Sequence, residues 1–483
     1  QRVMTDERPT PNPPLWLVMM TAAMAGGMGW GIRGQYGHET GAMIAGALVS
    51  LVLVFLFCPG NSSIHVIRAA AMGTIAMGFG GSMTYGQTIG LTHDGPLIGN
   101  WDALRWGMLG LAIKGGVWIG FAGLFLGLGL GGKRYKPFEM FLLILGMLMA
   151  VLIGWWLFNS PHDPANNRLP FLYFSDHWKW EPGVELKHRP EIWGGLLCAL
   201  ATGILYAALA KGDRLARNLA LWGMLGGALG FPLGQALQAT NAWNPDFFRE
   251  SFVGDVTRYF NWWNIMETTF GTVMGAVLGL GLWLNRRRIA VSSEPDVSPL
   301  PNWLIALLLA LHVSLLTLVE FSSFQWIDGV YDIGLMMGLI PLVACVRGRW
   351  WPYLQLLPIT LLPIAGKTLR AVADPINPSV SWLVYLILPI LLAMTLAVWF
   401  ARKAKPAGEH PAFIRNALLF CTWVYFGLNY AFFGFPWPWE AWGGRTPNAV
   451  LFFIAAMGLT LTALFFSPLG RRWQWKAWQR DWD

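Results

Sequence analysis

The sequence is poor in charged residues. Asp, Glu, Lys and Arg make up 12% of its 483 residues, whereas apolar residues reach 55%. The charged share is about half that of an ordinary globular domain, which is too little to cover a surface that faces water. Apolar stretches of about 20 residues, long enough to cross the hydrocarbon core of a bilayer, recur along the whole chain. We therefore expect an all-α polytopic membrane protein rather than a soluble one.

Cysteine is also scarce, and spacings typical of metal ligands are missing. The four cysteines are Cys58, Cys198, Cys345 and Cys421, and each lies inside or at the edge of an apolar segment. None is spaced from another as in a zinc knuckle, and because all four lie in apolar segments we also expect no disulfide. His162, His177 and His188 share one loop but do not have the spacing of zinc ligands. We therefore expect no metal.

Motifs for nucleotide binding are missing as well. The chain has no G-x-x-x-x-G-K-[ST] sequence and no G-x-G-x-x-G that follows a strand, which argues against an ATP-driven pump within this chain. No cofactor is expected. Residues 1–12 form a polar, proline-rich tail without the basic start and cleavage site of a signal peptide. We expect this tail to lie in the cytoplasm.

Fourteen apolar segments are long enough to span a membrane. They are residues 13–32, 40–58, 67–90, 103–131, 137–158, 191–210, 216–238, 262–284, 302–320, 330–346, 350–367, 381–400, 412–434 and 448–467. Hydropathy therefore predicts about 14 transmembrane helices.

Basic residues mark every second connection between these segments. They include Lys133, Arg134 and Lys136, then Arg286 to Arg288, and then Arg402, Lys403 and Lys405. Cytoplasmic loops carry an excess of Lys and Arg, so the alternation predicts a plasma (inner) membrane protein with both termini in the cytoplasm and 159–190 outside. The same placement explains the net charge of +8 through membrane lipid, and we expect no nucleic-acid partner.

The first half of the chain contains a repeat. GFGGSMTYGQTIGLT (78–92) returns as GGALGFPLGQALQAT (226–240), and LGLGLGGKR (126–134) returns as LGLGLWLNR (278–286). Self-similarity at this distance indicates a duplicated unit. Because each copy holds four predicted spans, we expect two parallel four-helix units, 13–136 and 137–289, related by an axis along the membrane normal.

Glycine content divides the chain further. Residues up to 290 include 44 glycines, and the rest include 12. The polar segment 290–301 is predicted to be a linker, followed by a six-helix membrane domain (302–467) and a cytoplasmic tail (468–483). Glycine faces let helix backbones approach closely in lipid, so we expect tight helix contacts at Gly78, Gly86, Gly226 and Gly234.

Polar side chains gather near the predicted outer ends of the helices. In RGQYGHETG, Arg33 can hold an anion through its planar fork, while His38 and Glu39 are candidates for proton transfer and catalysis. The alternative is that these residues cap two helix ends and pair with each other. The segment has only one histidine, so it does not match the HExxH zinc motif.

Five further residues are candidate ligands for a substrate. Gln87 and Gln235 hold equivalent positions in the repeat, and their amides can either grip a polar solute or join helices to each other. Lys114 and Glu267 lie deeper, where each costs about 2.5–3.5 kcal/mol without a partner, so we expect them to approach each other. Asn241 belongs to an aromatic outer loop of the kind that suits a sugar or lipid headgroup.

Three functions fit these features. The first is a transporter or permease for a small polar or anionic solute, with its site in the outer half of the duplicated domain. The second is a membrane-embedded transferase that acts on a lipid- or sugar-bearing substrate at the outer leaflet, which leaves open whether the chain is an enzyme. The third is a scaffold subunit with protein partners in a membrane complex. The duplication and the buried charges favour the transporter, whereas the one-sided polarity and the 29 tryptophans favour the transferase.

Overall fold

The computed structural model describes residues 13–37, 39–59, 63–83, 85–166, 168–175, 180, 188–290, 300–322, 326–327, 351–373, 377–403, 411–433 and 442–466. Within these ranges the chain forms helices and no β-strand. The chain is thus a helical membrane protein, as its composition predicts. Nine of the described helices are long and apolar enough to cross a bilayer.

The first part of the chain contributes α1 (Leu15–Arg33), α2 (Glu39–Phe57), α3 (Ser63–Gly80), α4 (Gly86–His93), α5 (Trp101–Leu130), α6 (Pro137–Phe158), α7 (Trp193–Leu205), α8 (Arg214–Trp243), the short α9 (Pro245–Arg249) and α10 (Gly254–Thr257), and α11 (Trp262–Asn285). The second part contributes α12 (Asn302–Phe321), α15 (Trp351–Leu354), α16 (Thr360–Val372), α17 (Pro378–Trp382), α18 (Leu388–Lys403), α19 (Pro411–Phe433) and α20 (Thr446–Phe465).

Most predicted segments coincide with helices. The segment predicted at 137–158 is α6, and the one at 262–284 is α11. The segment predicted at 67–90 is divided between α3 and α4. The one predicted at 330–346 lies outside the described residues, so the total of fourteen spans stays a prediction.

Three of the long helices begin at a side-chain cap. Asn100, Asp213 and Asn261 stand before α5, α8 and α11, and each accepts a hydrogen bond from a backbone N–H in the first turn. Such caps satisfy donors that a helix start leaves unpaired, typically stabilising it by about 1 kcal/mol. The starts of these helices are therefore specified locally by the sequence.

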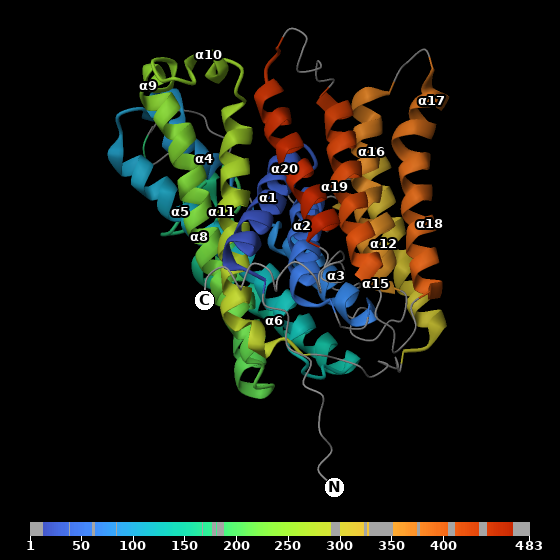
Figure 1. The fold of residues 1–483 in the computed structure, drawn as a ribbon. Helices are drawn as coiled ribbons and strands as arrows, with labels where there is room; N and C mark the ends of the chain where they lie inside the picture. Colours follow the sequence, from blue (N-terminus) through green and yellow to red (C-terminus); the bar gives the residue numbers. More distant parts are fainter. Residues whose placement is uncertain are drawn as a thin grey trace, which may run out of the picture.

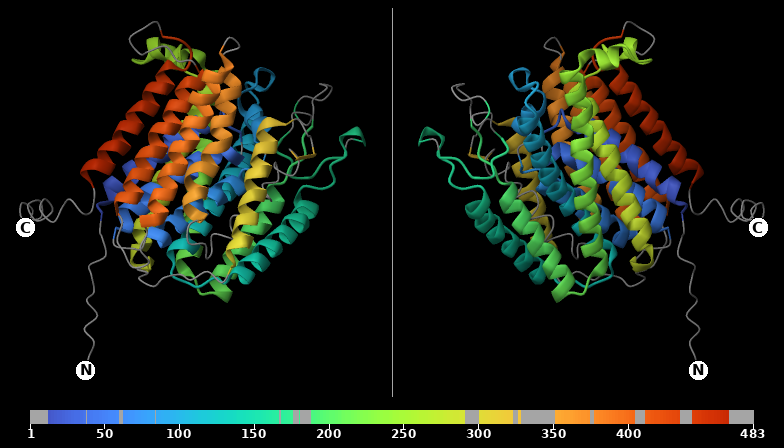
Figure 2. Two further views of the ribbon diagram at one scale, coloured as in Figure 1. Left: turned by 90° about the vertical axis from the view of Figure 1, so that its right-hand side faces the viewer. Right: turned by 90° about the vertical axis from the view of Figure 1, so that its left-hand side faces the viewer.

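The helix α2 lies at the centre of the bundle. Its apolar stretch Thr40–Phe57 is fully buried, whereas most residues of Pro378–Arg402 in α17 and α18 are not. α2 packs against α1 and α3, and also against α16 and α19 of the second part. Figures 1 and 2 show α1 to α3 inside, flanked on one side by α5, α8 and α11 and on the other by α16, α18 and α19. The two predicted domains therefore meet around α2.

Glycine faces bring the helices of the first part into backbone contact. A Cβ atom added to Gly26 of α1 would collide with the carbonyl oxygen of Gly271 in α11. Gly115 of α5 stands in the same relation to Gly227 of α8. Because lipid tails are as apolar as the helices, association depends on such close packing rather than on the hydrophobic effect.

The predicted glycine contacts are only partly right. A Cβ at Gly234 would collide with the carbonyl oxygen of Met266, and one at Gly226 would lie 3.2 Å from that of Met274, which is tighter than ordinary contact. A Cβ at Gly86, however, would meet no atom within 4 Å. The prediction is wrong for Gly86, because this residue begins the separate helix α4.

The two predicted four-helix units are built differently where the repeat is strongest. The helix of the first unit is interrupted between Gly80 and Gly86. Its counterpart α8 runs unbroken from Arg214 to Trp243, even though it contains Pro232. The parallel duplication therefore stays a prediction.

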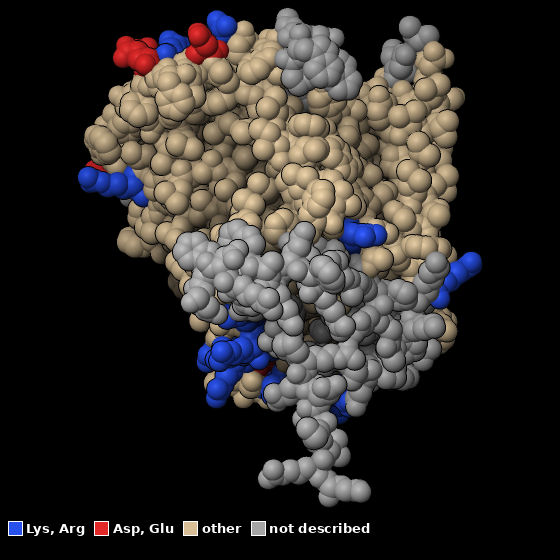
Figure 3. Space-filling model, in the orientation of Figure 1, with Lys and Arg blue, Asp and Glu red and all other residues tan. Residues whose placement is uncertain are grey.

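Charged side chains lie at the two ends of the bundle. On the face in Figure 3, basic residues gather at the lower end, and mixed charges lie at the upper left, where Figure 1 places α9 and α10. Arg287 and Arg288 are exposed after α11, and Asp246 and Arg249 are exposed in α9. A broad band with few charges separates them, as expected for a surface that faces lipid. We call the end with Arg286 to Arg288 the basic end.

The contact between α1 and α11 leads to a stability test. Gly271→Ala places a methyl group against the backbone of Gly26, so we expect it to destabilise the protein by about 1–3 kcal/mol through overpacking. Thermal unfolding of the purified protein in detergent measures this. Gly146→Ala in α6 is the matched control, because a Cβ there meets nothing within 4 Å and Ala favours helix. Equal unfolding midpoints for Gly271→Ala and Gly146→Ala would show that the close glycine contact does not contribute measurably to stability.

Candidate functional site

The break between α3 and α4 is the first component of the site. α3 ends at Gly80, and the chain does not resume a helix until Gly86. Tyr85, immediately before α4, is buried and faces both α1 and α11. A helix interrupted within the membrane leaves backbone groups that the helix itself cannot pair, and such breaks are tolerated only inside protein or along a cavity.

Arg33 and Glu267 form a buried ion pair next to this break. Arg33 ends α1 and is 2% exposed, while Glu267 lies in the second turn of α11 and is fully buried. Arg33 Nη2 lies 3.3 Å from Glu267 Oε1. The same Nη2 donates to the hydroxyl of Tyr85, which in turn donates to Glu267 Oε1 at 3.0 Å. Three elements thus meet at one carboxylate oxygen.

Aromatic rings enclose the guanidinium of Arg33. The Arg33 Cζ atom lies 5.1 Å from the ring centre of Trp30, 5.2 Å from Tyr85 and 5.4 Å from Trp118. A cation within about 6 Å of a ring face is attracted by the ring quadrupole, most strongly by tryptophan. The rings therefore stabilise the charge of Arg33 while excluding water from it.

The second oxygen of Glu267 is held by its own helix and by α1. Asn264 Nδ2 donates to Glu267 Oε2 at 3.3 Å and to the carbonyl of Gly31 at 2.7 Å. A Cβ atom at Gly34 would collide with Oε2. The glycine after α1 therefore allows the backbone to approach the carboxylate closely.

The pairing of Arg33 is incomplete. Its Nε and Nη1 atoms are buried and have no hydrogen-bond partner among the described residues, and neither has the indole nitrogen of Trp30. An unsatisfied buried donor costs about 1–3 kcal/mol, and more when it is charged. Buried polar groups without a protein partner usually bind water or a ligand. The guanidinium therefore has an unused edge beside the helix break.

Lys114 belongs to a second buried ion pair, and its pairing is complete. Its ammonium donates to Thr88 at 2.8 Å, to Ser175 at 3.0 Å and to Glu191 at 2.7 Å. An ammonium has three donors, so these bonds use all of them. Glu191 also accepts from the Ser175 hydroxyl, the backbone N–H of Phe174 and the indole of Trp193. This pair fastens the loop before α7 to α4 and α5.

The sequence predicts that Lys114 and Glu267 approach each other, directly or through one water, and the direct ion pair is wrong. Each charge has its own counter-ion, Glu191 for Lys114 and Arg33 for Glu267. The reason is the neighbourhood of the helices: α11 packs along α1, and α5 carries Lys114 toward the loop that precedes α7. The sequence analysis placed Glu191 at the start of the predicted span 191–210 and did not consider it as a counter-ion. An acidic residue at the edge of an apolar span was the signal that could have identified it as the partner of Lys114.

The amide candidates lie on α4 and α8, which are in contact. Gln235 is buried and donates to the hydroxyl of Thr92 at 2.7 Å, so it joins the two helices. Gln87 is half-buried in the first turn of α4. Asn241 is half-buried near the end of α8. Of the two roles considered for Gln235, binding a polar solute or joining helices, the structure thus shows the second.

Of the two candidates for proton transfer, His38 lies outside the described residues, as does the side chain of Glu39. The turn that contains them is tied to the second part of the chain by Tyr36. Its carbonyl accepts from Lys367 at 2.9 Å, and its hydroxyl lies 3.0 Å from that of Thr368. Gly37 follows with a φ of +88°, a conformation that favours glycine. The α1–α2 turn is therefore closed and short.

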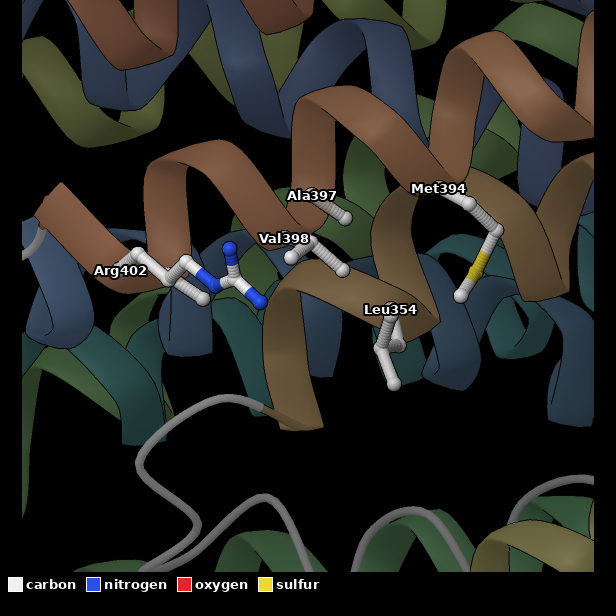
Figure 4. Close-up of a pocket in the computed structure, with 6 residues that line it drawn as sticks. Leu354, Met394, Ala397, Val398 and Arg402 are labelled. Atoms are coloured by element: carbon white, nitrogen blue, oxygen red, sulfur yellow. The ribbon is translucent and has the colours of Figure 1, made fainter.

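A separate cavity of about 460 Å³ lies between α15 and α18 (Figure 4). Its lining consists of Leu354, Met394, Ala397, Val398, Ala401 and Arg402. Apart from Arg402, these side chains offer a polar solute no hydrogen bond. The cavity suits an apolar chain better than a polar substrate, and it includes none of the candidate residues.

Comparisons with known proteins found no match: neither a family model, nor a curated protein, nor a solved structure resembles the chain. Its function must therefore be inferred from its own residues.

The completeness of the Lys114 pair leads to a test of its role. Lys114→Met removes one partner and leaves Glu191 buried without its cation, so we expect a loss of about 3–5 kcal/mol in stability. Adding Glu191→Gln removes the uncompensated charge but keeps an acceptor oxygen for Phe174 and Trp193, so the double variant should recover part of the loss. Thermal unfolding in detergent compares the three proteins. A double variant less stable than Lys114→Met would contradict a purely structural pair.

Proposed function

We propose that this chain transports a small anionic solute across the membrane and binds it at Arg33. The observation that carries the proposal is the contrast between the two buried cations. Lys114 uses all three of its donors, whereas Arg33 keeps two nitrogens without a partner among the described residues. A saturated cation is a structural element. A buried cation with unused donors is prepared for a ligand of opposite charge.

The break between α3 and α4 supports a transporter. In many transporters, solutes bind where membrane helices are interrupted, because the interruption frees polar groups and gives the chain a place to bend. Here Tyr85 lies in the break and contacts both Arg33 and Glu267. Movement of α4 relative to α3 would therefore shift Tyr85 and change its hydrogen bonds to Arg33 and Glu267.

The location of the site follows from the helix directions. Arg33 ends α1, and Glu267 lies five residues, or about 8 Å, inside the start of α11, both at the end of the bundle opposite Arg286 to Arg288. The positive-inside rule assigns the basic end to the cytoplasm. We therefore propose that the site lies in the outer half of the membrane. The proposal keeps the fourteen spans, the cytoplasmic termini and the parallel repeat that the sequence predicts.

A transferase acting at the outer leaflet is less well supported. It would need an open, polar surface in the long loop that follows α6. One segment of this loop is instead packed down, with Tyr173, Phe174 and Ser175 buried and Ser175 bonded to Lys114 and Glu191. These residues serve as an anchor rather than as a substrate platform.

The transport proposal is tested in proteoliposomes. We expect the wild-type protein to exchange at least one radiolabelled anion from a panel of chloride, lactate, phosphate and sulfate. Arg33→Lys should abolish this exchange while the protein still folds, because lysine keeps the charge opposite Glu267 but lacks the planar fork.

Arg370→Lys is the matched control for this experiment. Arg370 also pairs with a buried carboxylate, Glu320 at 2.7 Å, but it is 43% exposed and its counter-ion is not Glu267. Its exchange rate should equal that of wild type. Exchange that survives in folded Arg33→Lys, or no exchange of any anion by wild type, would reject the proposal.

The orientation is tested separately with introduced cysteines. Phe252, between α9 and α10, is fully exposed, and Arg287 is exposed at the basic end. In intact cells, Phe252→Cys should react with a membrane-impermeant thiol reagent, and Arg287→Cys should react only after lysis. The unmodified protein gives the background from its own cysteines. The reverse pattern would invert the orientation and place the site in the inner half.

A further inference from the structure

We propose that the solute is a monoanion, such as a small monocarboxylate, and that it binds together with one proton, which is taken up by Glu267. This inference rests on the proposed function, because it concerns the same site. It adds the charge class of the solute and the source of coupling.

The charge balance of the site favours a monoanion that binds with one proton. Arg33 and Glu267 are 2% and 0% exposed, and together they are neutral. An uncompensated charge in such surroundings is expensive, so the site favours ligands that keep it neutral. If a monoanion binds to Arg33 and a proton binds to Glu267, the sum of charges stays at zero. A dianion such as sulfate would leave one negative charge without a counter-ion.

The geometry of the ion pair favours a carboxylate as the solute group that binds Arg33. Glu267 reaches Arg33 through a single 3.3 Å contact at Nη2, so it does not use the two-pronged face of the guanidinium. A planar carboxylate can take two parallel hydrogen bonds from an arginine, which are shorter and stronger than one long contact. The unused Nε and Nη1 atoms supply the second donor on either side of Nη2. An incoming carboxylate therefore competes well with Glu267.

Tyr85 permits the exchange of partners. Its hydroxyl now donates to Glu267 Oε1 at 3.0 Å. A hydroxyl both donates and accepts, so a protonated Glu267 can donate to Tyr85 while Tyr85 turns its own hydrogen toward the bound anion. The proton comes from solution and ends on a Glu267 oxygen. The ionic contact from Arg33 to Glu267 is replaced by one from Arg33 to the solute.

Other charged groups near Glu267 are few among the described residues. From α1 it faces Arg33, from the helix break Tyr85, and from its own helix the neutral Asn264. Arg445, before α20, also interacts electrostatically with Glu267. Burial lowers the pKa of the Arg445 guanidinium, and the negative charge of Glu267 opposes this lowering. Arg445 is only partly buried, so water screens its charge, and the neutrality of the buried site depends on Arg33 and Glu267. Glu267 is thus the group in this set that can change charge.

The experiment measures proton uptake on binding. Calorimetry with sodium lactate on the purified wild-type protein, in two buffers with different ionisation enthalpies, gives the number of protons bound per anion. We expect one proton per lactate, and an affinity that falls by about tenfold per pH unit where Glu267 is ionised in the free protein. The affinity falls as pH rises because an ionised Glu267 occupies Arg33. Sulfate should bind much more weakly than lactate.

Variants locate the proton. Glu267→Gln should bind lactate without proton uptake and with little dependence on pH. Glu320→Gln is the matched control, since Glu320 is equally buried but pairs with Arg370, and it should behave as wild type. His38 and Glu39 are the alternative proton acceptors that the sequence offers. Loss of proton uptake in Glu39→Gln or His38→Gln, with uptake kept in Glu267→Gln, would assign the proton elsewhere and overturn the inference.

Failure of this inference is distinguishable from failure of the proposed function. Arg33-dependent anion exchange without proton uptake on binding, or with tighter binding of sulfate than of lactate, rejects the inference and leaves the transporter. Lactate binding with proton uptake, but no exchange in proteoliposomes, supports the inference and rejects transport. If wild type binds neither anion at millimolar concentration, the unused nitrogens of Arg33 are met by water and the inference is wrong.

Discussion

The backbone contact between α1 and α11 determines the position of everything at the site. Gly26 and Gly271 have no side chains to separate the two helices, so their backbones touch. Toward the end of the bundle opposite the basic end, the same pair of helices carries Arg33 and Glu267. Dispersion contacts between small residues, which drive association in lipid, therefore also set the distance between the two buried charges.

The two buried ion pairs show how the surroundings decide what a charge does. Lys114 lies against a loop that supplies Ser175 and Glu191, and its three donors are saturated. Arg33 lies among rings, which attract its charge but accept no ordinary hydrogen bond. The cost of burial is thus offset completely in one case and partly in the other. The incomplete pair is the one beside the helix break.

The second part of the chain restrains the turn that follows Arg33. Lys367 of α16 donates to the carbonyl of Tyr36 and lies 4.0 Å from Glu320 of α12. The turn between α1 and α2 is therefore held between Glu267 on one side and a charged cluster of the later helices on the other. Any movement of α16 relative to α2 would act on this turn and hence on Arg33. This gives the later helices a physical connection to the site.

The sequence by itself determined the membrane character and most helix positions, because hydrophobic length is a property of a continuous segment and needs no knowledge of neighbours. It also singled out Lys114 and Glu267, since a charge inside an apolar stretch stands out in one dimension, and Arg33 as the first residue of the polar segment RGQYGHETG. The break before Gly86 and the partners of each charge were decided only by the tertiary structure. Lys114 and Glu267 carry opposite charges and were both predicted to lie deep in the membrane, yet which charges meet depends on which helices pack together. Glycine contacts paired α1 with α11, and so brought Arg33 to Glu267 and left Glu191 for Lys114.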